Sequence, residues 1–100
     1  AQNSSMGQVG SVFLDTAATT FTPTNGNVIV AITMITDNVG FSALTPEDTT
    51  KYIGISQAGY EGGGDTLATG DQFPQGMTIF GRWTSVSVQT DGDQILCYVG

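Results

Sequence analysis

One segment, residues 27–36, is apolar at both odd and even positions and rich in β-branched side chains. In an extended chain, Val28 and Ile32 would point to one side, and Ile29 and Ile35 to the other. A strand with two apolar faces is typical of the centre of a sheet, where other layers or a neighbouring subunit cover both sides. A buried helix is the alternative, and the density of β-branched residues counts against it. The segment therefore predicts a central strand.

Two turn signals divide the rest of the chain into short strands. Asn25-Gly26 follows Pro23, and Asp91-Gly92 separates the alternating segment 84–89 from the apolar segment 94–99. The second arrangement predicts a C-terminal β-hairpin. Turns about 8–12 residues apart are typical of small all-β domains. We therefore predict an all-β fold, a small antiparallel β-sandwich or barrel ending in that hairpin.

The 100 residues suit one domain. We expect residues 1–10, which are polar and contain glycine, to form a flexible N-terminal arm, and residues 11–100 to form a single β domain. The remaining expectations, in chain order, are one or two short strands in 11–22, a short strand at 41–44, a turn or single helical turn at 45–48, a strand at 52–56, a mobile glycine-rich surface loop at 57–72 and a turn at 73–76.

The charge balance excludes several functions. The chain has nine acidic residues, two basic residues (Lys51 and Arg82) and no histidine, for a net charge of −7. Two cations do not neutralise a nucleic-acid backbone, and an anionic membrane would repel the chain. Without histidine there is no imidazole base, no histidine-bound zinc and no Ser-His-Asp triad. We predict a non-enzymatic protein with no cofactor, no nucleic-acid partner and no membrane partner.

The single cysteine, Cys97, lies in the apolar run 95–99 and cannot form an intrachain disulfide. We interpret it as a buried structural residue, because no base stands near it in sequence. The start of the chain has neither a basic nor an apolar segment, so it is not a signal peptide. Ala1 is what remains when an initiator Met is trimmed, which suggests a complete chain made in the cytoplasm.

Acidic residues surround the glycine-rich segment, and Glu61, Asp65 and Asp71 could offer oxygen ligands to calcium. Their spacing is not that of an EF-hand loop, so a solvated acidic loop is favoured. The segment also lacks the Lys and Ser/Thr of a phosphate-binding loop. A carboxylate pair for glycoside hydrolysis is supported only by the number of acidic residues, because nothing in the sequence places two of them across a cleft.

The cluster Gly81-Arg82-Trp83 holds one of the two cations and the only tryptophan. We expect Arg82 to pair with a carboxylate, within the subunit or across an interface, and Trp83 to lie in the core. A solvent-facing Arg82 and a carbohydrate-stacking role for Trp83 are the alternatives.

Residues 73–86, FPQGMTIFGRWTSV, followed by the terminal Tyr98-Val99-Gly100, resemble a segment of small virion proteins of tailed bacteriophages, many from marine and cyanobacterial hosts. Residues 22–35, a Pro turn before a Val/Ile-rich strand, are similar to the first half of that family. The likeness extends over most of the chain after about Thr20. The motif residues that carry it are Phe73, Pro74, Gly76, Gly81, Arg82, Trp83 and Tyr98.

The resemblance implies a virion structural protein, made in the host cytoplasm, and we expect a capsid decoration (cement) protein on the outer shell. Its partner would be the major capsid protein, and acidic character suits an outer surface. The doubly apolar strand in so small a chain predicts a homo-oligomer, with a trimer favoured. Expected capsid contacts in the arm are Gln2, Asn3, Ser4, Ser5 and Met6. The alternatives are a tail, neck or fibre component, and a small carbohydrate-binding module that uses Trp83 and Tyr60.

Overall fold

The computed structural model describes residues 10–17, 19–24, 26–68 and 70–100. Eight strands and one 3-10 turn follow one another within these residues: β1 (Gly10–Leu14), β2 (Ile29–Met34), β3 (Val39–Pro46), β4 (Ile53–Gly54), β5 (Gln57–Ala58), η2 (Tyr60–Gly62), β6 (Gln72–Phe73), β7 (Thr78–Val88) and β8 (Ile95–Val99). Six strands pair antiparallel in the order β1-β8-β2-β7-β3-β6, and β4 pairs with β5. The prediction of an antiparallel all-β fold is confirmed. No helix among the described residues has the length and apolar character that crossing a membrane requires.

The predicted central strand is β2, which lies between β8 and β7. Its inward residues, among them Ile32 and Met34, are almost completely buried. On its other face, Ala31 is also buried, and its register partners are Tyr98 of β8 and Phe80 of β7. The second apolar face is therefore flanked by large side chains of the neighbouring strands.

The longest strand, β7, must bend sharply. Its first half pairs with β2 and its second half with β3, and Trp83 is a register partner in both pairings. At one end Met34 N donates to Met77 O (2.8 Å), and at the other Gln89 N donates to Gly40 O (3.0 Å). The chain from Met34 to Gly40 spans at most about 20 Å, whereas a straight strand from Met77 to Gln89 would be about 40 Å long. The two ends of β7 can therefore meet β2 and β3 only if the strand turns back on itself.

The bend divides the strands into two layers. One layer is β1-β8-β2 with the first half of β7, and the other is the second half of β7 with β3 and β6. Val86 of β7 pairs with β3 on one edge, and on its other edge Phe21 forms an isolated bridge with Val86. The core between the layers includes Leu14, Ile32, Met34, Val39, Phe41, Leu44, Trp83, Val86, Val88, Ile95 and Cys97.

The reversal predicted at residues 90–93 is present, and β8 follows it. Its hydrogen-bonded neighbours are β1 and β2, and β2 lies between β8 and β7. The turn therefore crosses from one layer to the other, whereas a simple hairpin would pair β7 with β8. Asp93 anchors it, because its Oδ2 accepts a hydrogen bond from Gly40 N (3.3 Å).

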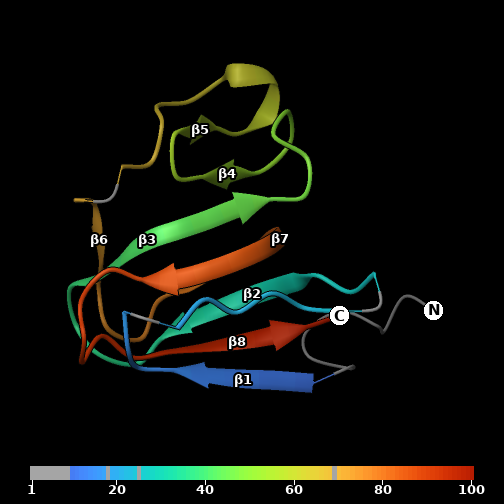
Figure 1. Cartoon of the computed structure of the whole chain (residues 1–100). Coiled ribbons are helices and arrows are strands. Elements are labelled where there is room, and N and C mark those ends of the chain that lie inside the picture. The colour runs from blue at the N-terminus through green and yellow to red at the C-terminus, as the bar shows by residue number, and fades with distance from the viewer. Residues whose placement is uncertain (1–9, 18, 25, 69) are drawn as a thin grey trace.

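Several boundaries differ from those predicted. Of the one or two strands predicted in 11–22, the described residues form one, and that strand begins at Gly10, within the predicted arm. Thr45 and Pro46 end β3 and do not begin a turn; the reversal starts at Asp48, whose carbonyl accepts from Lys51 N and Tyr52 N (both 3.1 Å). The segment predicted as a loop at 57–72 contains β5 and η2, which lie with β4 beyond β3 (Figure 1). These short elements escape sequence patterns because each has only two or three residues.

Candidate functional site

The Gly81-Arg82-Trp83 cluster is the corner of β7. Between the pairs Ile29–Trp83 and Ala31–Phe80, β2 has one intervening residue and β7 has two, Gly81 and Arg82. Such a bulge bends the strand that carries the extra residue. A second irregularity follows at once, where β7 has the extra residue Thr84 opposite the step from Thr45 to Pro46. The motif therefore allows one strand to serve both layers.

Trp83 is in the core, as predicted. Its exposed fraction is 0%, and its Nε1 donates a 2.8 Å hydrogen bond to Ile53 O of β4. A Cβ on Gly81 would lie 2.8 Å from Trp83 Cζ2, so the glycine leaves the space that the indole occupies. The carbohydrate-stacking hypothesis is wrong for Trp83, because the buried ring presents no face to a sugar. Tyr60, the other proposed platform, is 69% exposed.

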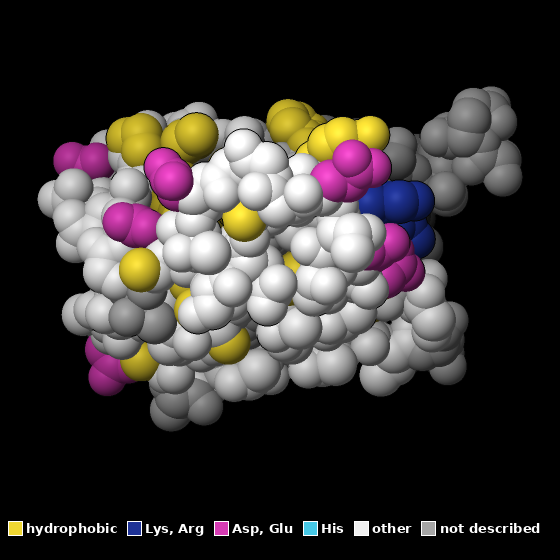
Figure 2. Space-filling view, turned by 90° about the horizontal axis from the view of Figure 1, so that it is seen from above, with side chains coloured by type: hydrophobic (Ala, Val, Ile, Leu, Met, Phe, Trp, Pro, Cys, Tyr) yellow, Lys and Arg dark blue, Asp and Glu magenta, His cyan; other side chains and the backbone are white. Residues whose placement is uncertain are grey.

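Arg82 pairs with a carboxylate of the same chain. Its Nε donates to Glu47 Oε1 (2.6 Å), and its carbonyl accepts from Glu47 N (2.8 Å). The hydrogen bond from Arg82 lowers the pKa of Glu47, and the pKa of Arg82 is raised in turn. Figure 2 shows the basic side chains gathered at one side of the molecule, next to acidic ones. Arg82 thus holds the turn after β3 against the corner of β7.

The other motif residues also shape the chain. Pro74 O accepts from Met77 N (3.3 Å) and Gly76 has φ +83°, as the third residue of a type II turn requires. Phe73 packs edge-on against Phe41, with ring centroids 5.5 Å apart. Tyr98 lies half-buried on the outward side of β8. The motif is thus spread over a turn, a corner and a sheet face, and forms no single site.

No catalytic arrangement emerges among the residues that the structure describes. Cys97 is fully buried, and burial raises the pKa of its thiol to about 12. Asp71 is occupied locally, since its Oδ2 accepts from Ala68 N (2.8 Å). In the described ranges, no three His, Cys, Asp or Glu side chains lie close enough together to hold a metal ion.

The feature that the sequence analysis missed is an uncharged apolar sheet face. We define the outer face by the eight outward register positions of the first layer: Ser11, Phe13, Ala31, Thr33, Thr78, Phe80, Leu96 and Tyr98. Phe13 is 50% exposed and Phe80 is 64% exposed. None of the eight positions carries a charge, although the chain has a net charge of −7. The sequence signal for this face was the apolar character of both odd and even positions in 12–14 and 79–80, which places apolar side chains on both sides of these strands.

The outer face is also ordered. Phe13 lies opposite Leu96, and Ala31 lies between Tyr98 and Phe80, so the eight positions form two rows across four strands. Thr33 and Thr78 link β2 to β7 through their hydroxyls (2.9 Å). Exposed apolar side chains that share one face of a domain are typical of an interaction site. This face is the candidate functional site.

The predicted arm contacts, Gln2, Asn3, Ser4, Ser5 and Met6, lie outside the described residues, and their role stays a prediction. No protein-family model, curated protein or solved structure matches this chain.

Proposed function

We propose that this chain is a non-enzymatic virion structural protein of a tailed bacteriophage, and specifically a capsid decoration protein that binds the major capsid protein on the outside of the shell. The likeness of residues 73–86 to small phage virion proteins suggests the setting. The observation that carries the proposal is the outer face, where Phe13 and Phe80 are exposed and no charge interrupts the surface. Interface cores are typically depleted of charge and enriched in aromatic residues.

The activity that follows is thermodynamic. A protein that binds the assembled lattice and not the free subunits stabilises the lattice by mass action, and the effect grows with the ratio of its concentration to its dissociation constant. The acidic remainder of the surface would face solvent and keep the decorated particles apart. A homo-oligomer, with a trimer favoured, would present several outer faces to neighbouring capsid subunits and gain from their combined binding.

The test is binding to empty shells of the phage that encodes the chain. We expect the wild-type protein to sediment with shells and to raise their melting temperature. Phe80→Lys places a charge in the middle of the outer face and should weaken binding at least tenfold, because a desolvated charge without a partner is costly. Met77→Lys is the matched control, since Met77 is 41% exposed and is not one of the eight outer-face positions.

Two results would contradict the proposal. Equal loss in both variants would show that the outer face is not the contact. Mass spectrometry of purified virions provides the second check, because a decoration protein should approach the copy number of the shell protein. A few copies per particle would indicate a tail, neck or fibre component instead.

A further inference from the structure

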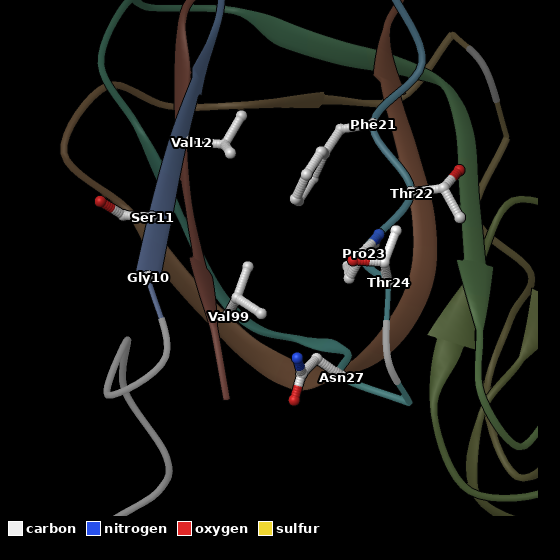
Figure 3. Close-up of a pocket in the computed structure, with 9 residues that line it drawn as sticks. All are labelled: Gly10, Ser11, Val12, Phe21, Thr22, Pro23, Thr24, Asn27 and Val99. Carbon is white, nitrogen blue, oxygen red and sulfur yellow. The ribbon is translucent and has the colours of Figure 1, made fainter.

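A hollow of about 320 Å³ opens at the rim of the sandwich, between the first strand and the segment that precedes β2. Figure 3 shows β1 on one side, residues 21–24 on the other, and the side chains of Val12, Phe21 and Val99 projecting into the space between them. We call this hollow the rim groove. Its lining residues are Gly10, Ser11, Val12, Phe21, Thr22, Pro23, Thr24, Asn27 and Val99, and none of them is charged.

The rim groove exists because the inward side chains of β1 become smaller toward its first residue and no longer fill the space between the layers. The inward positions of this strand are Leu14, Val12 and Gly10, and Leu14 is 5% exposed while Val12 is half-buried. Gly10 lies opposite Val99 and contributes no side chain, and a Cβ there would meet nothing within 4 Å. The two layers are therefore open at this end.

The groove borders a free strand edge. Within the described residues, β8 is the one strand paired with β1, so the other side of β1 has unpaired backbone donors and acceptors. Edge strands usually carry a lysine, a proline or a bulge that prevents pairing with another chain. The sequence of β1, GSVFL, has no charge and no proline, and its register with β8 is regular.

The chemistry of the occupant follows from these two features. A free edge binds an extended backbone, and successive side chains of such a strand point to opposite faces. One set would enter the rim groove against Val12, Phe21 and Val99, and the other would lie beside Phe13 on the outer face. Both environments are uncharged, and the net charge of −7 disfavours an acidic segment.

A second copy of this chain fits less well. Pairing two β1 edges would join strands of five residues, about 17 Å long, and would leave the inward position opposite Gly10 without a side chain. A stable dimer buries about 800 Å² on each partner, more than so short an edge supplies. We propose that β1 and the rim groove accept an extended, apolar, non-acidic segment of another protein, which adds a strand to the sheet.

The probe is a displayed library of random ten-residue peptides, selected on the immobilised full-length chain. Two variants separate the groove from the edge. Gly10→Leu fills the rim groove from within and should fold, because the space at Gly10 is empty and its φ is not positive. Phe13→Lys places a lysine on the edge. The matched controls are Gly70→Leu, at another open glycine, and Met77→Lys.

We expect enriched peptides to be rich in apolar and β-branched residues and to lack acids. Each variant should weaken them at least tenfold, while the controls stay within twofold. In the complex, amide protons of β1 should exchange more slowly with solvent, because added strand pairing protects them. Three results would overturn the inference: no enriched family, peptides indifferent to Gly10→Leu, or sedimentation showing that the wild type dimerises and that Phe13→Lys separates it. The selection uses no capsid, so its outcome is independent of the proposed shell binding.

Discussion

Replacing Gly81 by alanine tests whether the corner of β7 requires a residue without a Cβ, because the indole of Trp83 packs against Gly81. An added Cβ would lie 2.8 Å from Trp83 Cζ2, 2.9 Å from Cη2 and 3.2 Å from Cε2. Carbon atoms normally approach to about 3.5–4.0 Å, so the overlap reaches roughly 0.7–1.2 Å. The indole is fully buried and hydrogen-bonded through Nε1, so it has little freedom to move away.

The magnitude follows from two opposing effects. Inserting a methyl group into a packed core costs about 1–3 kcal/mol, and replacing glycine recovers about 0.4–1 kcal/mol of unfolded-chain entropy. The net loss in the free energy of unfolding should be about 1–2 kcal/mol. For a domain of this size, that corresponds to a fall in Tm of roughly 4–16 °C. Thermal unfolding followed by circular dichroism measures it.

The control is a double-mutant cycle with Trp83→Phe. A phenyl ring lacks the part of the indole that the new methyl group would touch, so Gly81→Ala should cost less than about 0.5 kcal/mol in that background. Circular dichroism is needed here, because Trp83 is the only tryptophan and its fluorescence is lost. An equal cost in both backgrounds would refute the reasoning, since the destabilisation would then come from the backbone and not from the ring.

Two further predictions concern titratable groups. Burial raises the pKa of Cys97 to about 12, so between about pH 9 and 12 the folded state holds a proton that the unfolded state releases. The free energy of unfolding should therefore fall as pH rises through this range. In Cys97→Ala, the free energy of unfolding should depend less on pH over the same range. Equal slopes for the two proteins in urea unfolding would contradict this assignment. The pKa of Glu47 is lowered by its hydrogen bond from Arg82, so the stability from this pair is present above the unfolded pKa near 4.3 and is lost as pH falls through the folded value. Because the two side chains are 40% and 44% exposed, Glu47→Gln should cost less than about 1 kcal/mol at pH 7, and a larger loss would show a role beyond this exposed pair.

The sequence predicts the central strand well, because the residues of β2 are apolar on both sides and so indicate burial on both sides. Residues 28–34 are apolar at both parities, and the structure buries both parities between β8 and β7. The core position of Cys97 was predictable because it lies in the apolar run 95–99. That of Trp83 was predictable because a large aromatic side chain in a strand is usually mostly buried.

The local sequence pattern does not predict the course of β7. Residues 84–89 alternate and a strong turn follows, and this pattern suits a hairpin and a layer-crossing turn equally well. The choice is made by long-range pairing, since the second half of β7 pairs with β3 on one edge and with Phe21 on the other, while β8 pairs with β1 and β2. The bend at Gly81 was equally hidden, because a glycine two residues before a tryptophan in a strand does not reveal that the two must pack together.

The outer face and the rim groove meet at β1, and this shared border decides how they can be used. Phe13 belongs to the outer face and stands on the edge that borders the groove, so Phe13→Lys would disturb both. Gly10→Leu changes only the groove and Phe80→Lys only the face, because the two residues lie on different strands and opposite sides of the layer. If separate partners use them, each variant should weaken one interaction and leave the other unchanged. If a single capsid segment adds to β1 while its parent subunit covers the outer face, both variants should weaken shell binding, and their free-energy losses should be non-additive when the two contacts depend on each other.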